Sequence, residues 1–205
     1  EMVDRHAYFL LEPDHPGTMV FREAAERVMA TAGQRRSIWV TGTGPGRGTS
    51  LVTLNLACAL ALEGRVAIVD VRFESPGLSS LLGIESLGSV ERAYAERSVN
   101  PDATIEAGLV GNRLVVMTTH GGIGSEIFAT AAFGSIVSDL CTTCDYVLLD
   151  GPPIRSLLER RHLMAHVDGL IVTTSPSDLA TGIFESTVER AEGHAVLGCL
   201  INEME

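Results

Sequence analysis

Six short apolar runs, separated by segments with helical periodicity, limit the folds open to this chain more than any other feature of its sequence. Each run is a nearly continuous stretch of aliphatic and β-branched residues, which is typical of strands buried on both faces. The runs are 37–42, 65–70, 113–118, 146–151, 169–175 and 196–202, and helices are expected at 50–62, 91–97, 125–141, 157–166 and 179–191. This repetition predicts an α/β fold with a doubly wound, mostly parallel sheet and helices on both faces.

The first 36 residues do not follow this alternation. The stretch 18–33 is predicted to form an amphipathic helix, with Met19, Phe21 or Ala25, Val28 and Met29 on one side. We expect it to pack on the flank of the domain or on a neighbouring subunit. The predicted organisation is therefore an N-terminal extension with a flanking helix at 1–36 and a single α/β domain at 37–205.

Composition and charge exclude several classes of protein. Apolar residues make up 45% of the chain and charged residues 20%, which indicates a globular protein rather than a disordered one. The net charge of −11 disfavours nucleic acid and anionic membranes as partners. No apolar run approaches the ~18 residues of a membrane-spanning helix, so direct membrane insertion is not expected. Because the sequence begins at Glu1, we expect it to be trimmed, which leaves open whether a membrane anchor flanks it.

The cysteines do not form a recognisable metal or disulfide pattern. Cys141 and Cys144 form a CxxC pair with no second pair to complete a zinc site, and Cys58 and Cys199 lie far from them in sequence. We interpret Cys141 and Cys144 as buried, reduced thiols near a helix end rather than a redox or metal site, and the cysteine content indicates a cytosolic protein.

Four alternating glycines follow the first predicted strand and lead into a helix: Gly42, Gly44, Gly46 and Gly48. Backbone N–H groups in such a loop can converge on an anion at the helix N-terminus. The stretch fits the TGxxxGxG pattern of short-chain dehydrogenases, but those enzymes need a YxxxK pair and this chain contains no lysine. The phosphate-binding P-loop pattern GxxxxGK[ST] is met at Gly48 and Ser50, while Thr43 and Thr49 replace its first glycine and its lysine.

Five collinear motifs favour the P-loop over the dehydrogenase loop, because they resemble the motifs of the bacterial tyrosine kinases (BY-kinases) of capsule and exopolysaccharide export. The stretch 45–84, PGRGTSLVTLNLACALALEGRVAIVDVRFESPGLSSLLGI, resembles the P-loop, helix and second strand of that family, and YVLLDGPPI (146–154) resembles its Walker B strand. RLVVMTTHGGIGSEIFA, DGLIVTTSPSDLATG and LGCLINEM correspond in order and spacing. The resemblance covers essentially the whole chain and extends to the ParA/MinD-like ATPases, so it implies a P-loop NTPase fold for 37–205.

The resemblance implies the site, the cofactor and the partners. The implied nucleotide-binding residues are Gly44, Pro45, Gly46, Arg47, Gly48, Thr49, Ser50 and Asn202. Ser50, Asp70 and Asp150 would hold Mg²⁺ with ATP or ADP, if a metal binds at all. The implied partner is a membrane polysaccharide co-polymerase or a related export protein, and active members also assemble into rings of their own copies. The implied location is the cytoplasm, at the inner face of the membrane through a partner or a segment outside this sequence.

The chain departs from the family at the positions that carry charge. Thr49 stands where the P-loop lysine is expected, and Asp70-Val71-Arg72 replaces the family's Asp-x-Asp. We expect the Arg72 guanidinium to form a bidentate ion pair with Asp70 or Asp150 and to occupy the place of the metal ion. Arg47 is expected to be solvated.

Two further departures concern assembly and the phosphorylated tail. The family's ring motif, roughly ExxRxxR, reads Met19-x-x-Arg22-x-x-Ala25, and the chain ends INEME without a tyrosine cluster.

The sequence resembles the BY-kinases but lacks the charged residues that they carry at the P-loop and after the second strand. It therefore predicts a catalytically impaired tyrosine-kinase-like domain. Asp70 and Asp150 are remnants of the catalytic acids, and binding of ATP or ADP is expected to be weak or absent. Its role would be regulation or scaffolding in polysaccharide synthesis and export. Two alternatives stay open: an active, divergent ATPase or tyrosine autokinase with a rearranged metal site, and a ParA-like positioning ATPase, which the net charge disfavours.

Overall fold

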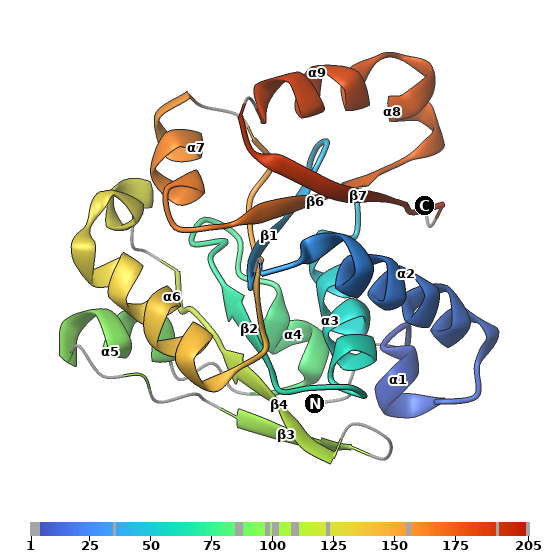
Figure 1. Ribbon diagram of the computed structural model, residues 1–205, viewed down its shortest axis with the longest axis horizontal. Helices are drawn as coiled ribbons and strands as arrows, with labels where there is room; N and C mark the ends of the chain where they lie inside the picture. The colour runs from blue at the N-terminus through green and yellow to red at the C-terminus, as the bar shows by residue number, and fades with distance from the viewer. Residues whose placement is uncertain are drawn as a thin grey trace.

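A seven-stranded sheet with helices on both faces forms the centre of the protein (Figure 1). The computed structural model describes residues 5–34, 36–84, 88–96, 99, 103–107, 111–121, 124–154, 157–191 and 193–203. The strands are β1 (Ser37–Gly42), β2 (Val66–Asp70), β3 (Ala103–Ala107), β4 (Gly111–Met117), β5 (Tyr146–Asp150), β6 (Gly169–Thr174) and β7 (Ala195–Ile201).

The order of these strands across the sheet is β3-β4-β2-β5-β1-β6-β7. Every neighbouring pair is parallel except β3 and β4, which run antiparallel. The prediction of a doubly wound, mostly parallel sheet is therefore confirmed. Its six predicted strands correspond to β1, β2, β4, β5, β6 and β7, and the short edge strand β3 was not predicted.

The helices are α1 (Tyr8–Leu11), α2 (Pro16–Ala32), α3 (Thr49–Leu60), α4 (Leu78–Leu82), α5 (Ser89–Glu96), the 3₁₀ helix η1 (Ser125–Ala129), α6 (Ala131–Thr143), α7 (Leu157–Met164), α8 (Pro176–Ala180) and α9 (Ile183–Arg190). Two predicted helices are each divided in two. Thr130 caps the N-terminus of α6 by accepting a hydrogen bond from Phe133 N, which separates α6 from η1. Gly182, with φ of 75°, separates α8 from α9.

Two apolar cores lie on the two faces of the sheet. In β1, Ile38 and Val40 belong to one core and Trp39 to the other, which explains why the strand is apolar along its whole length. Helices α1 to α4 cover the first core, and α5, η1, α6 and α7 cover the second (Figure 1). Nearly every residue of α3 is buried, because α3 lies between the sheet and α2.

The N-terminal helices pack on the flank of the domain, against α3. Phe9, Ala25 and Val28 belong to the same core as α3, and Asn55 on α3 donates a hydrogen bond to the carbonyl of His6 over 2.9 Å. Met19, which we predicted on the apolar side of this helix, is instead 67% exposed. The helix turns its small residues towards α3, and Met19 lies outside that contact. The division at residue 36 stays a prediction.

Two expectations about buried side chains were wrong at the edge of the sheet. We predicted that the last strand is buried on both faces, but β7 has only β6 beside it and its residues are half-buried or exposed. Cys199, on β7, is consequently exposed. Cys141, near the end of α6, is half-buried rather than buried, whereas Cys144 is buried as expected, and Cys58 is also buried. All four cysteines are free thiols. Among the helices that the structure describes, none has the length and apolar character needed to cross a membrane.

Candidate nucleotide site

The glycine loop connects β1 to α3 at the carboxyl edge of the sheet, where ligands of doubly wound folds bind. Gly46 and Gly48 have φ values of 74° and 67°, a left-handed conformation that glycine adopts without strain. A cavity of about 800 Å³ opens beside the loop. Its lining comes mainly from 44–51, 71–77 and 151–153, so it joins the P-loop to the ends of β2 and β5.

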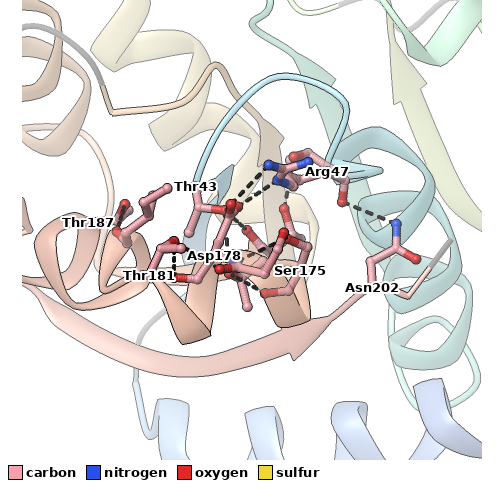
Figure 2. A network of polar contacts seen from close by, with 12 residues as sticks. Thr43, Arg47, Ser175, Asp178, Thr181, Thr187 and Asn202 are labelled. Carbon is pink, nitrogen blue, oxygen red and sulfur yellow. Dashed lines mark hydrogen bonds and ion pairs between the residues drawn. The ribbon is translucent and has the colours of Figure 1, made fainter. Parts of the chain in front are cut away.

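On one flank, the P-loop is fastened to α8 by an ion pair. Arg47 donates to Asp178 through Nε over 2.6 Å and through Nη2 over 2.9 Å, and the Thr43 hydroxyl donates to the same carboxylate (Figure 2). The Asp178 side chain is 4% exposed and that of Arg47 is 32% exposed. The hydrogen bonds from Arg47 and Thr43 hold the pKa of Asp178 below its usual range. The expectation of a solvated Arg47 was therefore wrong.

Asn202 supports the loop from the same flank. Its Nδ2 donates to the Arg47 carbonyl over 3.2 Å (Figure 2). A β-carbon added at Gly48 would lie 2.2 Å from this Nδ2, so the close approach requires a glycine. The resemblance implies that Asn202 binds a nucleotide, and that role stays a prediction.

Thr49, at the position of the missing lysine, faces β6. Its Oγ1 lies 2.9 Å from Oγ1 of Thr173, whose hydroxyl also lies 3.2 Å from the Thr41 carbonyl. The side chain is buried. Thr49 therefore joins a chain of hydroxyl groups within the protein and brings no positive charge to the loop.

On the other flank, two carboxyl groups lie side by side below the cavity. Asp70 and Asp150 are partners in the register of β2 and β5, and both are fully buried. The Asp70 oxygens accept hydrogen bonds from the backbone N–H groups of Arg72, Gly77 and Leu78 over 3.0, 3.0 and 3.1 Å. Burial raises the pKa of Asp70, and these bonds oppose the rise.

Asp150 is less well satisfied than Asp70. Within the described ranges, its Oδ1 lies 3.5 Å from the Thr53 hydroxyl and its Oδ2 has no hydrogen-bond partner. Burial, followed by the nearby charge of Asp70, raises the pKa of Asp150 to about 8. Asp150 therefore keeps its proton to a higher pH than an exposed aspartate does.

Arg72 does not form the predicted ion pair with either carboxyl group, which corrects the arrangement that we predicted. Its Nη1 donates to the Ser50 hydroxyl over 2.8 Å, and no ion pair joins it to Asp70 or Asp150 in the part of the chain described here. The reason is position. The acids end the strands and lie buried, whereas Arg72 lies past the end of β2 and its half-buried side chain lines the cavity.

This donor set does not fit a magnesium ion. In P-loop NTPases, Mg²⁺ is held by the loop Ser or Thr and by the Walker B Asp, which here are Ser50 and Asp150. The Ser50 hydroxyl already accepts a guanidinium hydrogen bond, and the Asp70 carboxylate accepts three backbone N–H groups. A second positive charge would also lie beside the guanidinium of Arg72.

Most of the predicted site residues therefore lie together. Gly44, Pro45, Gly46, Arg47, Gly48, Thr49 and Ser50 line the cavity with Arg72. Asn202 lies behind the loop. No sequence pattern marks Asp178 or Thr173 individually, although both lie at or after the end of β6, where the fold places ligand-binding residues.

No family model matches this chain. It is 29% identical over 161 residues to the iron-sulfur cluster carrier protein of Escherichia coli K12, a match that covers 72% of this chain and 40% of the relative. It is 23% identical over 146 residues to the tyrosine-protein kinase YwqD of Bacillus subtilis, covering 69% and 60%. It is 22% identical over 186 residues to the succinoglycan biosynthesis transport protein ExoP of Rhizobium meliloti, covering 85% and 23%. The chain thus spans less than two thirds of each of these relatives.

Solved structures resemble the whole fold. The chimerical protein CapA2B2 superposes with a TM-score of 0.85 at 22% identity, covering 98% of this chain and 91% of that one. The BceF tyrosine kinase domain gives 0.80 at 20% identity, covering 97% and 82%. The septum site-determining protein MinD of Pyrococcus horikoshii OT3, complexed with Mg-ADP, gives 0.62 at 21% identity, covering 82% and 70%. The chain therefore has the fold of these kinase domains and of MinD, and its relatives include tyrosine-protein kinases of the kind that its motifs resemble.

Proposed function

We propose that this domain no longer transfers phosphoryl groups and acts as a regulatory or scaffolding component of polysaccharide synthesis and export. The observation that carries the proposal is the hydrogen bond from Arg72 to Ser50, which places a guanidinium on the hydroxyl that would ligate Mg²⁺. The names of ExoP and YwqD, a succinoglycan transport protein and a tyrosine kinase, support the biological setting.

The charges that phosphoryl transfer requires are missing or used elsewhere. A P-loop lysine and a divalent metal ion normally neutralise the transferring phosphoryl group. At this site Thr49 bonds to Thr173, and Arg47 is paired with Asp178. Asp150, the Walker B acid, is buried beside Asp70, and burial raises its pKa. Arg72 alone cannot replace both the lysine and the metal ion.

A partner would then carry the function through the surface of the domain. We propose a membrane polysaccharide co-polymerase or a related export protein as that partner, with the domain held at the inner face of the membrane through it. Association with further copies of this chain is a second possible assembly. The relatives also include iron-sulfur cluster carrier proteins, and the CxxC pair of this chain lies away from the P-loop. Cys141 and Cys144 lie at the end of α6 that precedes β5, at the sheet edge opposite the P-loop, and the described residues contain no cluster of three metal-ligating side chains.

An assay with γ-labelled ATP and Mg²⁺ tests the proposal by measuring ATP hydrolysis and tyrosine phosphorylation. We expect no turnover above background for the chain as it stands. Thr49→Lys combined with Arg72→Asp should raise hydrolysis by about 100-fold or more, because it returns a cation to the loop and an acid to the metal site.

Thr31→Lys combined with Arg27→Asp is the matched control, since it makes the same charge changes on exposed positions of α2. Metal-dependent turnover by the unmodified chain would instead support the divergent, active ATPase or autokinase. A double variant that remains inert would show that the loss of charge does not account for the loss of activity.

A further inference from the structure

We propose that the cavity beside the P-loop binds the diphosphate group of a nucleoside diphosphate without magnesium, with the Arg72 guanidinium in the place of the metal ion. This inference rests on the proposed function, because it takes the P-loop as a site that binds and does not catalyse. It follows from four features of the described residues: the open loop backbone, the fixed guanidinium, the small number of charged groups on the cavity wall and the apolar wall.

The backbone of the loop faces open space. A β-carbon added at Gly44 or Gly46 would meet no described atom within 4 Å, and both residues line the cavity. Gly48 then caps the N-terminus of α3, a helix of 12 residues whose first turn contains Ser50. Exposed N–H groups at such a loop and helix N-terminus bind phosphate oxygens.

The Arg72 guanidinium is held at the edge of this loop. The bond from its Nη1 to Ser50 Oγ places it over the first turn of α3. The backbone at Gly77 packs closely against Ser50 and Arg72, since a β-carbon added there would lie 2.6 Å from Ser50 Oγ and 3.6 Å from Arg72 Nη1. Within the described ranges, Nε and Nη2 of Arg72 make no hydrogen bond. A planar guanidinium with free donors on a cavity wall matches the geometry of a phosphate group.

The charge of the lining favours a diphosphate over a triphosphate. The charged residues that line the cavity are Arg47, Arg72 and Glu74. Arg47 is paired with Asp178, and Glu74 is exposed, so Arg72 is the arginine of the lining that no ion pair engages among the described residues, and the buried carboxyl group of Asp70 lies near enough to interact with its charge. A third phosphate group would have neither the lysine nor the metal ion that normally neutralise it.

The rest of the cavity suits a nucleoside. Its volume of about 800 Å³ lies within the usual range of small-molecule sites. Phe73, Phe128, Pro152 and Pro153 contribute apolar surface to the wall. Apolar surface of this kind binds a base or sugar and would add nothing to the binding of free pyrophosphate.

Calorimetric titration with ADP, first in excess EDTA and then in excess Mg²⁺, tests the inference. We expect ADP to bind in EDTA, and Mg²⁺ to change its Kd by less than about threefold. Arg72→Ala should weaken binding in EDTA by about 10- to 100-fold, because a charge-assisted contact is lost. Arg72→Lys should weaken the binding of ADP less than Arg72→Ala does, and Arg72→Asp should bind ADP only with Mg²⁺. Arg27→Ala, which removes an exposed arginine far from the loop, should bind as the unmodified chain does.

Several results would overturn the inference: no binding of ADP by the unmodified chain, binding that requires Mg²⁺, or an unchanged Kd in a folded Arg72→Ala chain. Pyrophosphate is titrated alongside. Weaker binding of pyrophosphate than of ADP supports a nucleotide, and equal binding would contradict the nucleoside part. Hydrolysis of ATP would overturn the proposed function, whereas an inert chain that fails to bind ADP would overturn this inference alone.

Discussion

The two flanks of the P-loop differ in how their charges are satisfied. On the α8 flank, Arg47 and Asp178 neutralise each other within a hydrogen-bonded network, and the pKa of Asp178 is lowered. On the β2–β5 flank, Asp70 and Asp150 are buried beside each other, the pKa of Asp150 is raised to about 8, and Arg72 is bonded to a neutral hydroxyl.

This difference distinguishes a structural contact from a binding surface. The α8 flank is complete without any ligand, because each charged group has a protein partner. The β2–β5 flank retains an unpartnered carboxyl oxygen, within the residues described, and a guanidinium with donors facing a cavity. A ligand or a proton therefore has to complete the second flank.

The largest expected effect is on the β2–β5 flank, at Asp150→Asn. The carboxyl pKa is about 3.9 in the unfolded chain and about 8 in the folded one. Between these values the folded state binds the proton that the unfolded state releases, so the free energy of unfolding falls as pH rises from about 4 to 8. Asp150→Asn removes the contribution of this carboxyl group to the pH dependence. The difference in the free energy of unfolding, variant minus unmodified chain, should therefore be larger above pH 8 than at pH 4 by on the order of 2–5 kcal/mol. Urea unfolding across this pH range measures it, and a difference that does not vary with pH would contradict the raised pKa.

The opposite dependence is expected on the α8 flank. Asp178→Asn should lower the free energy of unfolding at pH 7 by about 1–3 kcal/mol, because Arg47 and Thr43 lose a charged acceptor. A lowered pKa contributes stability above the unfolded value of about 3.9 and loses it as pH falls through the folded value. The free energies of unfolding of Asp178→Asn and of the unmodified chain should therefore become equal at acid pH. Asp139→Asn, at an exposed position of α6, serves as the control. A deficit that persists at the lowest pH would show that the ion pair is not its source.

The smallest effect concerns the contact between the loop and Asn202. Gly48→Ala should cost about 1–2 kcal/mol, since a left-handed residue gains a β-carbon and Asn202 has to move aside. Gly44→Ala, with open space around it, should change stability by less than about 0.5 kcal/mol. Thermal unfolding of both variants measures the contrast. Equal stabilities would indicate that Asn202 does not brace the loop.

The sequence predicted the central strands and the loop because both follow from local patterns. Continuous apolar runs produced the strands, and four alternating glycines marked the loop. The partners of the two arginines could not be predicted in this way. Arg47 and Asp178 are 131 residues apart, and their meeting depends on β1 lying beside β6. Arg72 was expected on a carboxylate by charge alone, but the backbone N–H groups had already satisfied Asp70, which no sequence pattern displays.

The position of β1 in the sheet has a consequence for folding during synthesis. Ser37 pairs with Val147 on β5 and Ile38 pairs with Gly169 on β6, so both neighbours of β1 are translated long after it. At roughly 5–20 residues per second, the ribosome needs about 5–26 s to deliver them. Throughout that interval β1 has two unpaired edges, a known route to aggregation. The P-loop is thus among the first parts of the described chain to emerge and among the last to acquire its support.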